Sequence, residues 1–372
     1  MSAFSVRNKW EPLEVVMLGN NYDADFFRDI KNDNIRSALS QIADETLEDL
    51  ENFERVLKNY GASVIRPIMD RSDSIMNHID SEGTLGKNEP EWFQQGVPRG
   101  PLEPRDTHLV INDHLFQTHD AHPNIQVALD QYSKDNVVRL KDNIFSAPSH
   151  TLVNNDLLID VDPGDRPVPW WTQLLHPSIT DLNLPVTPTK YSITKGIPRW
   201  ELLYKENIAT IKNLYPYINI IRIEEGGHTD GVFHTVKQGA ILSVKDVGTH
   251  AKVFPNWDVL HLPDESWTKV EPFLTQKEGI AKSWWVPDQK DNPEFQHFVN
   301  TWLSDWVGFC EESVFDVNVL VLDPETVCIN NKNPLVIDFL KKHNMGYIHV
   351  PWRHRYFWDG GIHCITLDLK RS

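Results

Sequence analysis

The chain has 372 residues, of which 40% are apolar and 24% charged, a composition typical of soluble globular proteins and atypical of disordered ones. Asp and Glu (53 residues) outnumber Lys and Arg (36), and the net charge of −17 disfavours nucleic acid and anionic membrane surfaces as partners. The N-terminus lacks the apolar core of a signal peptide, and no later stretch approaches about 18 consecutive apolar residues. We therefore expect a cytoplasmic protein without a membrane anchor.

The predicted elements begin with a strand over residues 14–19. Apolar side chains then recur at three- to five-residue steps over residues 35–60. This spacing predicts a long helix that stops at Gly61 and packs on the outside of a sheet. Two hairpins follow, over residues 105–117 and 150–159, because each stretch joins two β-rich runs through a few turn-forming residues.

Two stretches interrupt this pattern in the second half of the chain. Residues 162–198 are rich in proline and are predicted to form a long rigid loop. Residues 268–310 contain many aromatic side chains, with a helix expected from about Glu294 onward. We interpret both stretches as packed surface insertions, with a lid or a subunit interface as the alternative.

Further elements of the same design follow these insertions. Hairpins are predicted over residues 231–243 and 317–329, a helix begins at Pro334, and strands are predicted over 347–351 and 362–367. The module is therefore hairpin, helix and strand. Since the first and last strands of the chain complete a fifth unit, the recurrence predicts a radial repeat that closes into a ring.

Three cysteines, Cys310, Cys328 and Cys364, occur near the end of the chain. An odd number of them does not form a disulfide framework, which fits a reducing compartment. Cys310 and Cys328 are interpreted as small buried hydrophobic residues. Cys364 follows Gly360 and Gly361, which let the backbone approach another group closely, and it is the candidate nucleophile.

A second polar cluster lies at the start of the hairpin over residues 231–243. His228 and Asp230 are two residues apart, so in a strand both side chains would project from one face. An imidazole and a carboxylate in one pocket can supply a proton shuttle and an anchor for a cation. The alternative is a solvent-facing polar surface. The strand that opens with Arg105 and Asp106 adds a further carboxylate to this pattern.

These motifs, in chain order, resemble the glycine/arginine amidinotransferases of the guanidine-modifying (pentein) superfamily. The motifs are residues 10–16, 104–106, 228–233, 239–243, 317–323 and 360–364. The resemblance spans nearly the whole chain outside the two insertions. It implies an α/β fold, a five-bladed α/β propeller of ββαβ modules, formed as a single domain over residues 1–372. A homodimer is compatible with it, since members of the family are often dimeric.

The resemblance also implies a function and a set of site residues. The implied reaction moves an amidino group from arginine or another guanidino donor to an amine acceptor. Asp106 and Asp230 match positions that hold the guanidinium group, Cys364 matches the covalent nucleophile, and His228 matches the acid that protonates the leaving amine and later acts as base. The partners are therefore small molecules, and the chemistry requires no metal or organic cofactor.

The sequence departs from the family at three positions. Ser149 occupies the position of the aspartate that orients the histidine, and a hydroxyl carries no charge to stabilise an imidazolium. The neighbouring His150 is a candidate to take over the role of that aspartate. The arginine that binds the donor carboxylate aligns with Val247, which leaves Lys245 as the nearest cation. Glu312 lies where the family has small polar residues, which would suit an amine-bearing substrate.

Two other functions are compatible with the same residues. A hydrolase of the arginine deiminase or dihydrolase type shares the covalent step and lets water complete the reaction. A binding protein that has lost catalysis would explain Ser149 and Val247. Dependence of turnover on an amine acceptor separates the transferase from the hydrolase, and a turned-over adduct on Cys364 excludes the binding protein.

Overall fold

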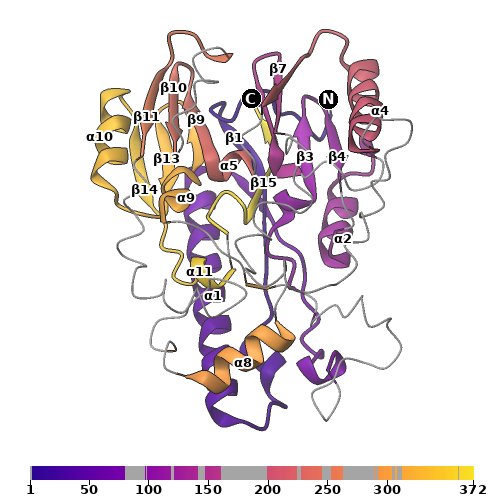
Figure 1. Ribbon diagram of the computed structural model, residues 1–372, viewed down its shortest axis with the longest axis vertical. Helices are drawn as coiled ribbons and strands as arrows, with labels where there is room; N and C mark the ends of the chain where they lie inside the picture. Colours follow the sequence, from indigo (N-terminus) through magenta and orange to yellow (C-terminus); the bar gives the residue numbers. More distant parts are fainter. Residues whose placement is uncertain are drawn as a thin grey trace, which may run out of the picture.

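The computed structural model contains five three-stranded sheets, which form the blades of a ring (Figure 1). In each sheet an antiparallel pair of strands is extended by a third strand that runs parallel to the central one. The predicted five-bladed α/β propeller is therefore confirmed. The structure describes residues 2–79, 97, 99–118, 121–140, 147–160, 199–223, 228–244, 253–262, 289, 292–303, 306–307, 312–358 and 360–372.

The strands follow the chain around the ring, and the first blade combines both ends of the chain. Its strands are β15 (Thr366–Arg371), β1 (Leu13–Leu18) and β2 (Ser63–Ile65). The next three blades contain β3 (His108–Ile111), β4 (His114–Gln117) and β5 (Val137–Arg139), then β6 (His150–Val153), β7 (Asp156–Asp160) and β8 (Asn219–Ile223), then β9 (Phe233–Lys237), β10 (Ala240–Ser243) and β11 (Asp258–His261). The last blade contains β12 (Leu320–Asp323), β13 (Thr326–Ile329) and β14 (Gly346–His349).

Helices connect the central strand to the parallel strand in four blades, as the predicted module requires. They are α1 (Asp33–Tyr60), α2 (Pro123–Tyr132), α4 (Arg199–Leu214) and α10 (Pro334–Lys342). A parallel pair needs such a crossover because its two strands start at the same edge of the sheet. Two further helices, α8 (Pro293–Trp302) and α11 (Arg355–Trp358), lie outside this module.

Local sequence accounts for these boundaries. The hairpin turns place Asn112, Asn154 and Gly239 at positive φ angles of 52°, 56° and 87°, which asparagine and glycine tolerate best. The side chain of Asn32 caps the N-terminus of α1, and Gly61 ends the helix in the left-handed conformation at φ 112°. The predicted long helix and its stop at Gly61 are therefore confirmed.

The ring closes through pairing of the two chain ends. Strand β1 pairs antiparallel with β15, with Met17 opposite Leu367 and Leu18 opposite Thr366. The predicted fifth unit is thereby confirmed, although its last strand begins at Thr366 and not at Ile362. Consequently Cys364 lies in a turn that precedes the strand.

The two predicted insertions are only partly visible. Residues 162–198 lie outside the described part of the chain. Of residues 268–310, α8 is described, and it begins at Pro293, close to the predicted start. Asn32, at the N-terminus of α1, donates to Glu294 of α8 at 2.9 Å, so α8 packs against the long helix (Figure 1). Among the described residues, no helix has the length and apolar character needed to cross a bilayer.

Candidate active site

The candidate site is built from the segments that precede the first strands of the blades. These are the turn before β15 and four short helices, η4 (Pro104–Asp106) before β3, η5 (Ala147–Ser149) before β6, α5 (Thr229–Val232) before β9 and α9 (Glu312–Val317) before β12. Helix α5 contacts α9 and η5, η5 contacts η4, and η4 contacts β15. Residues far apart in the sequence therefore meet in one ring of pre-strand segments.

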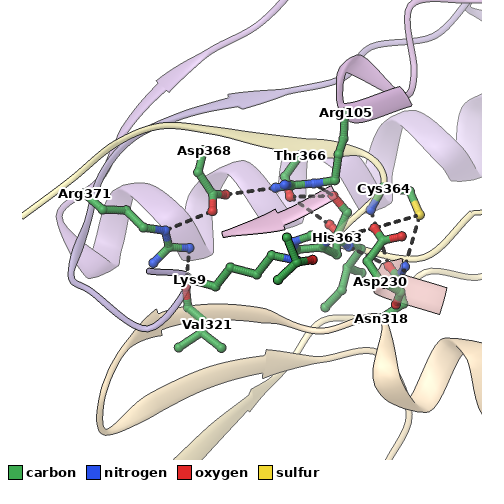
Figure 2. Close-up of polar contacts among 12 residues, drawn as sticks. Lys9, Arg105, Asp230, Asn318, Val321, His363, Cys364, Thr366, Asp368 and Arg371 are labelled. Atoms are coloured by element: carbon green, nitrogen blue, oxygen red, sulfur yellow. Dashed lines mark hydrogen bonds and ion pairs between the residues drawn. The ribbon is translucent and has the colours of Figure 1, made fainter. Parts of the chain in front are cut away.

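Cys364 lies within this ring among polar groups. Its side chain is 8% exposed. The Sγ atom lies 3.6 Å from Oδ2 of Asp230, to which the thiol donates, and it accepts a hydrogen bond of 3.1 Å from Nδ2 of Asn318 (Figure 2). A cysteine with a carboxylate and an amide on its sulfur differs from an inert core cysteine, whose neighbours are apolar.

The surroundings of Cys364 favour the neutral thiol in the absence of a ligand. Burial raises the pKa of Cys364 well above that of an ordinary thiol, and the negative charges of Asp230, Asp106 and Glu103 raise it further. A backbone hydrogen bond from Gly361 acts in the opposite direction. A cation placed among these carboxylates would remove their contribution and favour the thiolate.

Two carboxylate oxygens at this site have no hydrogen-bond partner among the described residues. They are Oδ1 of Asp106 and Oδ1 of Asp230, and both atoms are buried. Asp230 is 1% exposed. Because a buried carboxylate oxygen without a donor is costly, such atoms indicate a place where a ligand supplies the missing N–H groups. A planar guanidinium carries several N–H donors and a positive charge.

The second oxygen of Asp230 is held by the residue next to the cysteine. Nδ1 of His363 lies 2.7 Å from Oδ2 of Asp230, and since a carboxylate only accepts, Nδ1 carries the hydrogen. Burial lowers the pKa of His363 well below its usual value, and the charges of Arg105 and Lys9 lower it further. His363 is therefore a neutral donor that fixes the orientation of the Asp230 carboxylate.

A buried network of charges supports the cysteine turn from the other side (Figure 2). Arg105 donates to the carbonyl of His363 at 2.9 Å and pairs with Asp368 at 3.0 Å. Asp368 also pairs with Arg371 at 2.9 Å. Burial and the charge of Arg105 lower the pKa of Lys9 to about 8, and Nζ of Lys9 donates to Thr151 at 3.3 Å. These contacts connect η4 to β15, and the N-terminal segment at Lys9 to β6.

The two glycines before Cys364 are required by close approaches of the backbone. A Cβ atom at Gly360 would overlap the carboxylate of Glu103, and a Cβ atom at Gly361 would overlap the side-chain amide of Asn318. The predicted role of this glycine pair is therefore confirmed, and the groups that it approaches are now identified.

The prediction that His228 and Asp230 share one face of a strand is wrong. Strand β9 begins at Phe233, His228 is the N-cap of α5, and Asp230 lies in the first turn of that helix. The side chain of His228 is exposed, whereas that of Asp230 is buried. In a helix, residues two apart point in different directions, which explains the difference.

Asp106 also lies in a short helix and not at the start of a strand as predicted. Arg105 and Asp106 belong to η4, and strand β3 starts two residues later at His108. Pro104 at the first position of η4 favours this single turn of helix. The structure nevertheless brings Asp106, Asp230 and Cys364 together, as the electrostatic effect of both carboxylates on the thiol indicates.

The remaining predicted residues are only partly described. Ser149 ends η5 and His150 begins β6, where it pairs with Ile159, but the side chain of Ser149 is outside the described part of the chain. The same holds for the side chain of Glu312, whose backbone begins α9. Lys245, Val247 and Cys310 lie wholly outside it. Their predicted roles stay predictions.

Three residues of the site were not predicted from the sequence. Glu103 lies three residues before Asp106, His363 is next to Cys364, and Asn318 is a polar residue between Val317 and Val319, just before β12. A single buried amide in an apolar run is a signal that could have identified Asn318, since buried polar groups are usually hydrogen-bonded for a reason. Its partners come from distant parts of the chain and are not predictable from spacing.

Within the described residues, no group of three or more His, Cys, Asp or Glu side chains is arranged to hold a metal ion. Both described cysteines, Cys328 and Cys364, are free thiols. Cys328 lies on β13 in an apolar cluster, as predicted for a small buried hydrophobic residue. The candidate site is therefore an arrangement of one thiol, several carboxylates, amides and histidines.

Comparison with known proteins finds sequence similarity to one curated protein and structural similarity to several solved structures. No protein-family model matches the chain. In sequence the chain is 23% identical over 394 residues to inosamine-phosphate amidinotransferase 1 of Streptomyces griseus, a match that covers 100% of this chain and 98% of that protein.

Solved structures of amidinotransferases share the fold. The inosamine-phosphate amidinotransferase of Streptomyces griseus superposes with a TM-score of 0.59 at 17% identity, and SxtG, an amidinotransferase of Microseira wollei in the saxitoxin biosynthetic pathway, with a TM-score of 0.59 at 16% identity. Each match covers 100% of this chain and 98% of the other chain. Agmatine deiminase of C. jejuni is also similar, with a TM-score of 0.51 at 15% identity over 99% of this chain and 96% of that one.

The structural matches establish the propeller fold, and the sequence match extends over almost the full length of both proteins. Five mixed three-stranded sheets arranged in a ring agree with both findings. The chain is thus similar over its full length to an amidinotransferase, and it has the five-bladed propeller (pentein) fold.

Proposed function

We propose that this protein transfers an amidino group from arginine or another guanidino donor to an amine acceptor through a covalent intermediate on Cys364. The observation that carries the proposal is the thiol that donates to Asp230, together with the buried Oδ1 atoms of Asp230 and Asp106, which lack donors among the described residues. The charges of both carboxylates act on the thiol. The homology to amidinotransferases supports the same reaction.

Binding of the donor is proposed to rest on Asp106 and Asp230. Their buried oxygens would accept hydrogen bonds from the N–H groups of the guanidinium, which is a planar cation suited to paired carboxylates. Because Oδ2 of Asp230 is held by His363, its Oδ1 has a defined orientation toward the ligand. The central carbon of the guanidinium would then lie next to Sγ of Cys364.

The bound cation would also activate the thiol. In the free protein the charges of Asp230, Asp106 and Glu103 raise the pKa of Cys364, in addition to the effect of burial. A guanidinium neutralises part of this charge, so the thiolate forms mainly in the presence of its substrate. This arrangement limits the reactivity of the cysteine when no donor is bound.

The transfer consists of two steps, which form and then break down the covalent intermediate. The thiol proton passes to the imidazole of His228, and the thiolate adds to the guanidinium carbon. The C–N bond to the departing amine then breaks as His228 returns the proton to that amine, which leaves an amidino group on sulfur. In the second step the acceptor amine attacks the same carbon, His228 takes its proton, and the C–S bond breaks to release the thiolate.

The exposed position of His228 at the N-terminus of α5 is compatible with this role, since a proton shuttle must reach both the substrate and solvent. Ser149 would act through a hydrogen bond where the family has a charged aspartate. Lys245 and Glu312 are proposed to contact the remaining parts of donor and acceptor.

The test is an incubation of the purified protein with arginine labelled with carbon-13 in the guanidino group, together with a panel of amines. Mass spectrometry is expected to detect ornithine, a labelled guanidine product that depends on the amine, and a labelled adduct on the peptide that contains Cys364. Cys328→Ala is the matched control, because it removes the other described buried thiol and should leave turnover unchanged.

Two other outcomes decide against the proposal. Labelled citrulline or urea formed at an equal rate without any amine would show that water is the acceptor and that the protein is a hydrolase. The absence of product and of adduct with arginine and with other guanidino donors would assign the chain to a binding function.

A further inference from the structure

We infer that Asn318 is a further residue that supports the reaction. Its side chain positions the Cys364 turn and stabilises the thiolate through a hydrogen bond to sulfur. The inference rests on the proposed function of Cys364 as a nucleophile. Asn318 is 0% exposed and lies directly before β12, between α9 and the first strand of the last blade.

Both ends of the Asn318 amide are used to hold the nucleophile (Figure 2). Its Oδ1 accepts hydrogen bonds from the backbone N–H groups of His363 at 2.8 Å and of Cys364 at 3.3 Å. These two groups lie in the turn that carries the sulfur. Because a carbonyl oxygen with two donors fixes both of them, the backbone of the turn is held by a single side chain.

The nitrogen end of the same amide connects the sulfur to the helix of the carboxylate. Nδ2 donates to Sγ of Cys364 at 3.1 Å and to the backbone carbonyl of Asp230 at 3.3 Å. A residue of the last blade therefore connects the thiol of one blade to the backbone of Asp230 in another. This connection adds to the hydrogen bond from His363 to Asp230 in holding nucleophile and substrate anchor together, and small displacements of reacting groups slow reactions strongly.

The donor to sulfur matters most after the thiol has lost its proton. The neutral thiol donates to Asp230, but a thiolate can only accept and would repel that carboxylate. An N–H donor gains strength when its acceptor becomes charged, so the bond from Nδ2 favours the thiolate over the thiol. Asn318 thus supplies stabilisation in the charge state that the reaction needs.

A second observation supports this assignment independently of the hydrogen bonds. A Cβ atom at position 361 would overlap the amide of Asn318, so the glycine beside the cysteine provides the space that this side chain occupies. The amide and the turn are in contact over several atoms.

The test compares Asn318→Ala with Asn330→Ala. Asn330 is a matched control because it is also buried in the last blade, at 3% exposure, and its amide donates to the backbone carbonyl of Val350 at 3.2 Å. The readout is the pH dependence of alkylation by iodoacetamide, measured separately for the peptides of Cys364 and Cys328 by mass spectrometry. This reaction needs no guanidino substrate.

For Asn318→Ala we expect the midpoint of Cys364 alkylation to move up by about one pH unit, which corresponds to a roughly tenfold lower rate below the midpoint. Asn330→Ala should leave this midpoint unchanged, and the profile of Cys328 should not move in either variant. If amidino transfer is measurable, Asn318→Ala should lower kcat about tenfold or more with a smaller change in KM.

Asn318→Asp is the second test variant, for use if the alanine variant does not fold. It keeps a side chain of the same size and the oxygen that accepts hydrogen bonds from the backbone N–H groups of the turn. Its second oxygen faces sulfur in place of a donor, so the midpoint should again rise. A midpoint that stays the same or falls in both variants would overturn the role of Asn318. Failure of amidino transfer in the wild-type protein, with the shifted midpoint still observed, would instead contradict the proposed function.

Discussion

Cys328 and Cys364 are two buried thiols of one chain whose surroundings differ. Cys328 is 0% exposed on the central strand β13, within an apolar cluster, and burial alone raises its pKa. Cys364 lies in the turn before β15, where burial and then the charges of three carboxylates raise its pKa. Both thiols are neutral in the absence of a ligand. Only for Cys364 can a cationic ligand remove part of what raises the thiol pKa, namely the charges of the carboxylates.

The comparison shows that burial by itself does not distinguish a structural cysteine from a reactive one. A cation cannot enter the apolar surroundings of Cys328 without losing its hydration, whereas carboxylate oxygens without donors offer it a place beside Cys364. The structural elements that carry the two cysteines differ in the same way. Central strands of the blades are packed on both sides, and the pre-strand turns gather polar groups from several blades.

The largest effect that the comparison predicts comes from removing each sulfur in turn. Cys364→Ala should lower amidino transfer roughly a thousandfold or more, because the proposed covalent step is lost. Cys328→Ala should keep activity within about twofold and lower stability by about 1 kcal/mol, because it creates a small cavity. Product formation and thermal unfolding measure the two effects. Comparable loss of activity in both variants would contradict the assignment of Cys364 as the reactive cysteine and Cys328 as a structural one.

Asp230→Asn should separate the reactivity of the thiol from catalysis. Without the negative charge near sulfur, the pKa of Cys364 should fall, so alkylation at pH 8 should become about tenfold faster. Amidino transfer should instead slow by about a hundredfold, since an anchor for the guanidinium is lost.

The control for this prediction is Asp323→Asn at the end of β12, the strand that pairs with the strand of Cys328. It should change neither rate. Slower alkylation of Cys364 in Asp230→Asn would contradict the electrostatic origin of the high thiol pKa.

A smaller effect is expected from the glycine that allows the turn to approach Asn318. Gly361→Ala should displace the turn and lower amidino transfer roughly tenfold to a hundredfold, with a loss of about 1–3 kcal/mol in stability. Gly346→Ala on β14 is the matched control, because a Cβ atom there would be 3.7 Å from the nearest atom, the carbonyl oxygen of Glu325. Equal activities of the two variants would contradict the required close approach.

The smallest predicted effect concerns the pH dependence of stability. His234 is 1% exposed on β9 with no hydrogen-bond partner on its ring among the described residues, and burial followed by Lys9 and Arg105 lowers its pKa. The unfolded chain therefore binds a proton below pH 6.5 that the folded protein does not. Stability should fall as the pH is lowered from 6.5 to 5, by up to about 1.4 kcal/mol per pH unit from this residue.

Chemical denaturation of His234→Phe at several pH values measures this contribution, and the slope between pH 5 and 6.5 should become shallower. His297→Gln on the exposed surface of α8 should leave the slope as in the wild-type protein. An unchanged slope in His234→Phe would show that the ring is protonated in the folded state as well.

The blades themselves were largely predictable from the sequence. Hairpins follow from β-rich runs joined by asparagine or glycine, and α1 follows from an apolar stripe with a cap at Asn32 and a stop at Gly61. These signals are local, since turn geometry and helix capping depend on neighbouring residues alone. Even the closure of the ring by β1 and β15 could be inferred from the two unpaired strands at the chain ends.

The site was predictable only in part. The sequence indicated Cys364, Asp106 and Asp230, but it placed all three on strands, whereas the structure has them in turns and short helices before the strands. A three- or four-residue helix is too short to produce a periodic pattern, so it cannot be distinguished from the start of the following strand. The predicted shared direction of His228 and Asp230 was wrong for this reason.

By itself, then, the amino-acid sequence determined the repeating module, the order of the blades and the residue types of the site. The tertiary structure alone decided that Asn318 holds the Cys364 turn, that His363 orients Asp230, and that Arg105 supports the turn from behind. These contacts join residues 45 to 258 positions apart. Such pairs form because closure of the ring brings the pre-strand segments together, and no local signal specifies which of them will meet.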